Sequence, residues 1–300
     1  MALPAALTID LQGRSLVRVK DWTAAEIEAA LDLADELKAK QHRREPHRLL
    51  EGRTLGLLFR KHSTRTRVSL EVAAAQLGMT VVSLPGDELQ LARGESLEDT
   101  ARVLGRYLDA LAIRTHTHAE VEAFGVAGIP VVNALTDEAH PLQAIADLQT
   151  IRERFGTLEG VRVAWIGDGN NVCVSLAEAC ALLGATFVCA APAGYEPPGA
   201  QLVASPHEAA RDAQVLVTDV WTSMGQDAER EQRLRDFTGY TVDARVLAEA
   251  DSDAIVLHCL PAHPGEEITA DVLYGPQSAV WDEAENRLHT TKAVLALTLG

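Results

Sequence analysis

The chain has 300 residues, of which 47% are hydrophobic and 23% are charged, a composition typical of a globular protein of about two domains. Its formal net charge of −16 argues against nucleic acid and anionic membranes as partners. It contains no apolar run of about 18 residues and no signal-peptide pattern, so we expect a cytoplasmic protein without a membrane span.

Capping signals and apolar periodicity predict the elements of the first half of the chain. Thr23 and Glu26 form a capping-box pattern at the start of a helix, and Gly78 is a typical helix terminator. The predicted helices cover residues 23–40, 63–77, 96–108, 118–125 and 140–155, and the predicted strands cover 54–59, 80–84, 110–113 and 131–135. The polar segment 85–95 is predicted to be a loop.

The second half repeats this alternation of short strands and helices. The predicted strands cover residues 161–166, 186–190, 215–218 and 254–258, and the predicted helices cover 172–183, 206–212 and 285–299. This order is typical of an α/β protein, with two doubly wound domains that have mainly parallel sheets and are joined by interdomain helices. We expect the boundary within 140–160, which divides the chain into residues 1–145 and 146–284.

A dense cationic run, RKHSTRTR at 60–67, follows the strand predicted at 54–59. Where a strand meets a helix, free backbone N–H groups and the helix dipole favour an anion. Ser63 and Thr66 add hydroxyl donors, and Arg65 can hold two phosphate oxygens at once. The alternative interpretation is a helix-capping serine beside a solvated basic patch.

Three later residues fit the same anion. Arg114 ends a strand, and His140 and Gln143 begin a helix directly after another strand. Ligands of open α/β sheets bind outside the carboxyl ends of the strands, so these side chains are expected to meet in one crevice. A neutral histidine can donate a hydrogen bond to a carbonyl oxygen that gains negative charge. Taken alone, His140 would be read as a cap or a surface residue.

Together the motifs STRTR at 63–67, IRTH at 113–116 and HPLQ at 140–143 resemble the aspartate and ornithine carbamoyltransferases. The resemblance implies that the phosphate of carbamoyl phosphate is held by Ser63, Thr64, Arg65 and Thr66. It also implies that the carbamoyl group is held by Arg114, His140 and Gln143.

Motifs of the second half indicate the acceptor. GDGNN at 167–171, DVWTSMG at 219–225 and HCLP at 258–261 are similar to those of the ornithine-specific members. The resemblance implies that ornithine is bound by Asn171, Asp219, Ser223 and Met224, with Cys259 and Leu260 near the reacting groups. Asp219 would pair with the α-ammonium, whereas an aspartate acceptor would call for extra cations that this loop lacks.

The remaining expectations also follow from the resemblance. The motif DEAENRLHT at 282–290 implies that Arg287 reaches carbamoyl phosphate and that helix 285–300 packs back onto the first domain. Residues 1–145 would bind carbamoyl phosphate and 146–284 ornithine, giving citrulline in arginine biosynthesis without a cofactor. Gln90 lies in a segment that would reach a neighbouring subunit's site in a homotrimer or a higher assembly of trimers. The implied catalytic residues are Arg65, Arg114, His140, Gln143 and Cys259.

Several alternatives stay open at this point. Gly167 and Gly169 after a strand suggest a nicotinamide dehydrogenase, although a third glycine and an acidic residue after 186–190 are missing. A catalytically silent relative, or an acetylornithine, putrescine or aspartate carbamoyltransferase, are further candidates. No metal site is expected, because the histidines near Cys259 lack enough partner ligands and no C-x-x-C pair occurs among Cys173, Cys180, Cys189 and Cys259.

Overall fold

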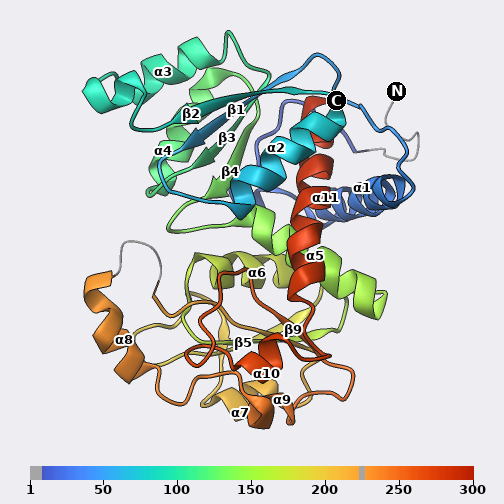
Figure 1. Cartoon of the computed structure of the whole chain (residues 1–300), viewed down its shortest axis with the longest axis vertical. Coiled ribbons are helices and arrows are strands. Elements are labelled where there is room, and N and C mark those ends of the chain that lie inside the picture. Colours follow the sequence, from blue (N-terminus) through green and yellow to red (C-terminus); the bar gives the residue numbers. More distant parts are fainter. Residues whose placement is uncertain (1–8, 223–226) are drawn as a thin grey trace. The chain divides into compact units, whose positions relative to one another are not determined.

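The computed structural model describes residues 9–222 and 227–300, and the chain divides into two compact units (Figure 1). One unit consists of Met1–Gln149 and Glu285–Gly300, and the other of Thr150–Ala284. Two long helices, α5 (Pro141–Phe155) and α11 (Val280–Leu299), contribute residues to both units. None of the helices in the described ranges combines the length and the apolarity that a membrane crossing requires.

The first unit is built on a parallel sheet with the strand order β2-β1-β3-β4. Its strands are β1 (Thr54–Phe59), β2 (Thr80–Pro85), β3 (Ala110–Arg114) and β4 (Val131–Leu135). β1 leads through α2 (Arg65–Leu77) to β2, and β3 leads through α4 (His118–Ala123) to β4 in the opposite direction. Right-handed crossovers therefore put α2 and α4 on opposite faces, so the sheet is doubly wound.

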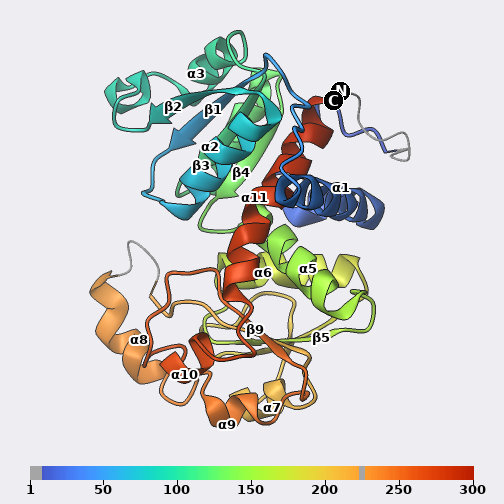
Figure 2. The ribbon, with the colours of Figure 1, turned by 45° about the vertical axis from the view of Figure 1, so that its right-hand side comes forward.

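Further helices complete the first unit. α1 (Ala24–His42) lies beside α11 in both views (Figures 1 and 2), and α3 (Leu97–Leu104) precedes β3. Three short 3-10 helices are η1 (Val19–Asp21), η2 (Gln90–Arg93) and η3 (Phe124–Ala127). All five residues of β3 are buried, and its Leu111 and Ile113 belong to an apolar cluster that includes Phe124. Burial on both faces is typical of a central parallel strand.

The second unit is a five-stranded parallel sheet with the order β7-β6-β5-β8-β9. Its strands are β5 (Arg162–Ile166), β6 (Thr186–Ala190), β7 (Gln201–Leu202), β8 (Val215–Val217) and β9 (Ile255–Leu257). Its helices are α6 (Asn171–Leu182), α7 (Pro206–Ala210), η4 (Asp227–Glu229), α8 (Arg230–Asp236), α9 (Ala244–Leu247) and α10 (Ala270–Leu273). α6 lies on one side of this sheet, and α7 and α9 lie on the other (Figures 1 and 2).

The predicted fold class is confirmed, because both units are parallel α/β sheets covered by helices on two faces. The predicted bounds of β1, β4 and β6 are those of the structure. Thr23 accepts a hydrogen bond from the backbone N–H of Glu26 and completes the capping box of α1. Gly78 ends α2 with φ +88°, a left-handed conformation that glycine adopts without a steric penalty.

Other predicted bounds were wrong. The helix predicted at 96–108 ends at Leu104. Gly105 follows it, and the chain packs so closely there that a Cβ would lie 2.0 Å from the carbonyl oxygen of Ala127. The final helix begins at Val280 rather than at 285, and the predicted loop 85–95 contains η2. The short elements β7, α8, α9 and α10 were not predicted, since two to seven residues carry little periodic signal.

A buried lysine of α11, Lys292, contacts the segment that follows α1. Lys292 is fully buried, and its Nζ lies 3.0 Å from Nε2 of the buried His47. His47 in turn hydrogen-bonds the carbonyl oxygen of Glu45 through Nδ1, so its Nε2 is the acceptor for Lys292. Burial lowers the pKa of Lys292 to about 8, against a nearby effect of Glu285 that raises it.

This lowered pKa makes the stability of the protein depend on pH in a defined window. Because the unfolded lysine titrates near 10.5, the unfolded state binds more protons than the folded state between about pH 8 and 10.5. From about pH 7 to pH 9.5, the free energy of unfolding should therefore rise by about 2 kcal/mol more in the wild type than in Lys292→Met. Urea denaturation at both pH values measures the difference, with the exposed Lys20→Met as the control. An equal rise in all three proteins would contradict the assignment.

Candidate active site

In the first unit, the loop after β1 lies at the switch point of the sheet. β1 and β3 are neighbours from which the chain runs to opposite edges, and the backbone N–H of Arg60 donates to the carbonyl oxygen of Arg114 at 2.8 Å. Ser63 is half-buried, and Thr64 and Arg65 are exposed. Crevices at such switch points are the usual ligand sites of open α/β sheets.

The helix that follows this loop starts at Arg65, and its first turn is only partly capped. Ser63 Oγ accepts from the backbone N–H of Thr66 at 3.3 Å, whereas the side chain of Thr64 makes no capping hydrogen bond. The cap expected in the alternative interpretation is therefore present at Ser63. It satisfies one of the N–H groups at the start of α2, a helix of 13 residues whose dipole adds positive potential there.

Much of the cationic run is balanced by carboxylates. Arg60 pairs with Glu120, and Lys61 pairs with Asp137. Arg67 Nε lies 2.9 Å from Oε1 of Glu71, one turn further along α2. Arg60 and Lys61 thus join the loop to distant segments, whereas Arg67 pairs within its own helix, and the charges of all three are compensated locally. The number of cations in the run 60–67 is therefore larger than the positive charge that is left to attract a ligand.

A buried polar cluster lies behind the loop and contains Thr66, Arg114, His140, Gln143 and Arg287. Arg287 connects its parts: Nη1 donates to Oε1 of Gln143, and Nη2 donates to Oγ1 of Thr66 at 3.1 Å. All five side chains are buried, with exposures of 6% or less. The starts of α2 and α5 and the middle of α11 thus bring together residues that are far apart in the sequence.

The electrostatics of this cluster fix the charge state of His140. Burial lowers the pKa of His140 well below its ordinary value, and the positive charges of Arg287 and Arg114 lower it further. The imidazole is therefore neutral at physiological pH. A neutral imidazole donates one hydrogen bond without adding a second charge beside the two guanidinium groups.

One predicted residue of the first unit lies apart from the buried cluster, and one residue that was not predicted belongs beside it. Gln90 is exposed in η2, outside the buried cluster of Arg287. Asp147 was missed by the sequence analysis, and its Oδ1 accepts from Nε2 of Gln143 at 2.8 Å. Since the two residues are four apart on α5, the i,i+4 spacing was the signal that could have revealed this partner. Asp147 fixes the amide orientation, so Gln143 presents its Oε1 to Arg287.

In the second unit, Asp219 is the centre of the predicted acceptor site. It follows β8, which with β5 flanks the switch point of this sheet. Asp219 is buried, with 5% exposure; its Oδ2 accepts from Nδ2 of Asn170 at 2.8 Å, and its Oδ1 accepts from Sγ of Cys259 at 3.1 Å. Asn170 also caps α6, so it fixes Asp219 to the helix start. The sequence analysis named the half-buried Asn171 and missed Asn170.

The turn that carries Cys259 and Leu260 is held by buried side chains. His258 Nδ1 accepts from the backbone N–H of Leu260 at 2.9 Å, and His258 Nε2 lies 3.1 Å from Oε1 of Glu267. The backbone N–H of His258 donates to Oε2 of Glu283 at 2.8 Å. Leu260 has φ +58°, which is unfavourable for a branched side chain, and these contacts offset that cost.

A buried ion pair supports the residues just before the predicted Ser223 and Met224. Arg233 Nη1 donates to Oδ2 of Asp168 and to the carbonyl oxygen of Trp221, both at 2.9 Å. Burial raises the pKa of Asp168 to about 6, and the charge of Arg233 opposes this rise. Ser223 and Met224 themselves lie outside the described residues.

Neither a nicotinamide nor a metal is needed to explain the motifs of the second unit. Gly169 donates its N–H to the carbonyl oxygen of Tyr195, and a Cβ on Gly169 would lie 2.3 Å from the backbone N of Pro197. The glycine thus allows two parts of the chain to approach closely. Side-chain atoms of Asp219, His258 and Cys259 lie near one another, but both ring nitrogens of His258 are already bonded within the turn.

Both halves of the chain match domains of one family of known proteins. Residues 14–153 match the carbamoyl-phosphate-binding domain of the aspartate/ornithine carbamoyltransferases, and residues 159–298 match their aspartate/ornithine-binding domain. Proteins named ornithine carbamoyltransferase from Pyrococcus horikoshii and Acidothermus cellulolyticus are 49% and 52% identical. The matches cover 98% of each chain for the first, and 93% of this chain and 94% of the relative for the second.

Solved structures give the same result. The ornithine carbamoyltransferase of Pyrococcus furiosus is 48% identical with a TM-score of 0.94, over 98% of this chain and 99% of that one. The enzyme of Thermus thermophilus is 44% identical with a TM-score of 0.89, over 100% of both chains. The chain belongs to the aspartate/ornithine carbamoyltransferase family.

Proposed function

We propose that the protein transfers the carbamoyl group of carbamoyl phosphate to the δ-amine of L-ornithine, giving L-citrulline and phosphate. The observation that carries this proposal is the buried cluster in which Arg287 joins Thr66 and Gln143 beside Arg114 and a neutral His140. Such a cluster suits a ligand with both an anionic and a carbonyl end. Within the proposal, residues 1–145 with 285–300 bind carbamoyl phosphate and residues 146–284 bind ornithine.

The phosphate end is assigned to the loop at the start of α2. Hydroxyl and guanidinium groups of this segment donate charge-assisted hydrogen bonds to the phosphate oxygens, together with the first N–H groups of α2. The assigned donors are Ser63, Thr64, Arg65 and Thr66, with Gln90 contributed to a neighbouring subunit. Because Thr66 Oγ1 accepts from Arg287, its own O–H bond remains a donor for the ligand.

The carbamoyl end is assigned to Arg114, His140, Gln143 and Arg287. When the neutral δ-amine attacks the carbamoyl carbon, a C–N bond forms and the carbonyl oxygen becomes an oxyanion. Arg114, His140 and Thr66 stabilise this oxyanion by hydrogen bonds, which strengthen as charge develops. The C–O bond to phosphate then breaks, and the departing phosphate takes the proton from the amine, so no separate protein base is required.

The acceptor end is assigned to the second unit. Asp219 offers a carboxylate to the α-ammonium of ornithine, and its present partners Asn170 and Cys259 hold it in one orientation. Asn171, Ser223 and Met224 complete the assigned ornithine contacts. Cys259 and Leu260 are assigned positions near the reacting groups, as the family resemblance implies. No cofactor takes part in the proposed reaction.

The proposal includes assembly into a homotrimer or a higher assembly of trimers. Val68 and Val72 on α2 and Val82 on the edge strand β2 are exposed by 52%, 36% and 38%. Exposed valines on an edge strand and the adjoining helix favour contact with another chain. We assign the protein to the cytoplasm and the reaction to arginine biosynthesis; a relative from Pyrococcus furiosus is named an anabolic ornithine carbamoyltransferase.

An acceptor comparison tests the proposed reaction. With carbamoyl phosphate, we expect citrulline from ornithine and no comparable phosphate release with acetylornithine, putrescine or aspartate. Asp219→Asn should raise the KM for ornithine by about ten- to hundredfold, because a charged hydrogen bond to the α-ammonium is lost. Asp251→Asn, at an exposed carboxylate of the same unit, is the matched control. Faster turnover of another acceptor would overturn the assignment of ornithine.

The role of His140 leads to a separate prediction. His140→Asn should lower kcat by about 10²–10³-fold, the usual cost of losing one oxyanion donor. In the wild type, NMR titration of the His140 ring should show an imidazole that is still neutral at pH values where an exposed histidine is already protonated, since its pKa is lowered by burial and by two arginines. The exposed His207→Asn serves as the control. A kcat of His140→Asn close to that of the wild type would exclude this role.

A further inference from the structure

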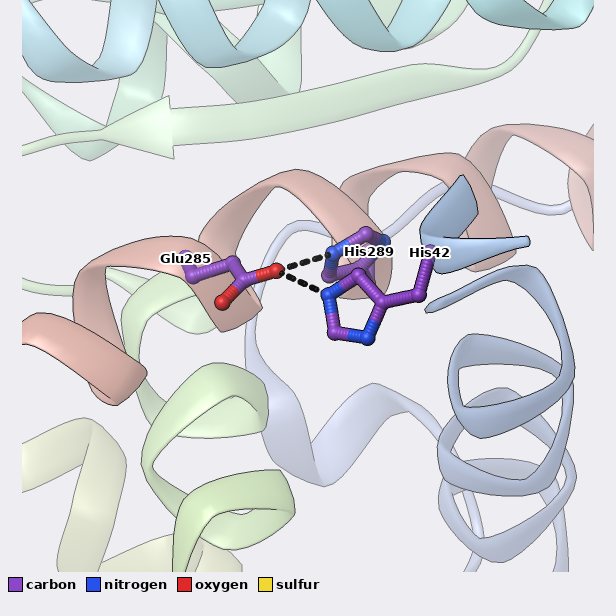
Figure 3. A group of neighbouring side chains, drawn as sticks. All are labelled: His42, Glu285 and His289. Carbon is purple, nitrogen blue, oxygen red and sulfur yellow. Dashed lines mark hydrogen bonds and ion pairs between the residues drawn. The ribbon is translucent and has the colours of Figure 1, made fainter. Parts of the chain in front are cut away.

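A cluster of two histidines and one glutamate lies in the first unit, where α1 ends beside α11 (Figure 3). His42 is the last residue of α1, and Glu285 and His289 are one turn apart on α11. The imidazole Nε2 atoms of His42 and His289 lie 2.8 and 3.3 Å from the same atom, Oε1 of Glu285. None of these three side chains has a part in the proposed reaction.

We propose that His42, Glu285 and His289 bind a divalent transition-metal ion of the nickel, cobalt or zinc class. Imidazole nitrogen and carboxylate oxygen are the ligands that these ions take from proteins. An ion about 2.0–2.2 Å from each ligand atom separates neighbouring ligands by roughly 3.3 Å in tetrahedral geometry. The three donor atoms already lie within 4.8 Å of one another, so small side-chain rotations reach this geometry.

The elements that carry the ligands favour binding. Glu285 and His289 occupy positions i and i+4 of a 20-residue helix, so their side chains share one face and stay in register. His289 is fully buried, which fixes its ring, whereas the side chains of His42 and Glu285 are 58% and 40% exposed. An ion can therefore enter from solvent, and water can complete its coordination.

The protonation states of His289 and Glu285 also suit metal binding. Burial and the charge of Lys292 lower the pKa of His289 to about 4, so its ring is neutral at physiological pH. Burial acts to raise the pKa of Glu285, but hydrogen bonds from His42 and His289 outweigh it, and the net pKa is lowered. A neutral imidazole and an ionised carboxylate are the forms that bind metal.

Two features limit the affinity. Lys38, whose Nζ bonds Oδ1 of Asn286 at 2.7 Å, and Lys292 bring positive charge near the ligands. The buried Nδ1 of His289 also lacks a hydrogen-bond partner among the described residues, and such a partner usually strengthens a histidine ligand. We therefore expect an exchangeable ion rather than a permanent structural one. Its effect would be to tie the end of α1 to the helix that carries Arg287.

Nickel titration of the tag-free full-length protein tests the proposal. Ni²⁺ is chosen because imidazole ligands suit it, whereas zinc also favours thiolates such as Cys259. Calorimetry should give one equivalent of bound Ni²⁺ per chain, and Ni²⁺ should raise the melting temperature. His42→Ala and Glu285→Gln should each weaken binding by at least about tenfold. His42 is exposed at a helix end, so its replacement leaves the fold intact.

Matched variants distinguish this site from others. His207→Ala removes an exposed histidine that is 3.8 Å from Glu249, and it should bind Ni²⁺ like the wild type. Cys259→Ser should also bind normally, because the cluster of Asp219, His258 and Cys259 is a different group. The proposal is overturned if the wild type does not bind Ni²⁺, if His42→Ala binds it as the wild type does, or if Cys259→Ser is the variant that loses it.

Discussion

The guanidinium group of Arg287 makes the contacts on which the candidate carbamoyl phosphate site depends. It bonds Thr66 at the start of α2 and Gln143 at the start of α5, and it comes from α11 near the end of the chain. A buried cation is costly unless its donors are satisfied, so these contacts select one arrangement of three helices. The part of α11 that belongs to the first unit thus supplies a central residue, Arg287, of the candidate site.

The same positive charge determines how the site can act. Burial, together with Arg287 and Arg114, lowers the pKa of His140 and keeps it neutral, so its ring can donate a hydrogen bond without adding another cation. In the second unit, the central buried group of the candidate site is a carboxylate. Asn170 and Cys259 hold the side chain of Asp219 in one orientation. Its negative charge suits an ammonium group. Under the proposed reaction, the arginines of the first unit would suit an anionic donor and the carboxylate of the second unit a cationic acceptor.

Sequence reasoning predicted the main strands and the motif-bearing loops that follow them, because apolar strands and the motif residues after them are local signals. It could not predict that Arg60 and Lys61 are balanced by Glu120 and Asp137, since those partners come from distant segments. It also missed α8, whose seven residues are anchored by tertiary contacts of Arg233. Residues that orient others from distant parts of the chain are set by packing and leave little pattern in the sequence.

Binding of carbamoyl phosphate to Arg287→Gln, compared with the wild type, tests the central claim most directly. Equilibrium titration should show a dissociation constant raised by about ten- to hundredfold, because charged hydrogen bonds of a buried guanidinium are lost. Arg245→Gln, which changes an exposed arginine of α9, should bind as the wild type does. An unchanged dissociation constant in a folded Arg287→Gln protein would contradict the claim that Arg287 organises this site.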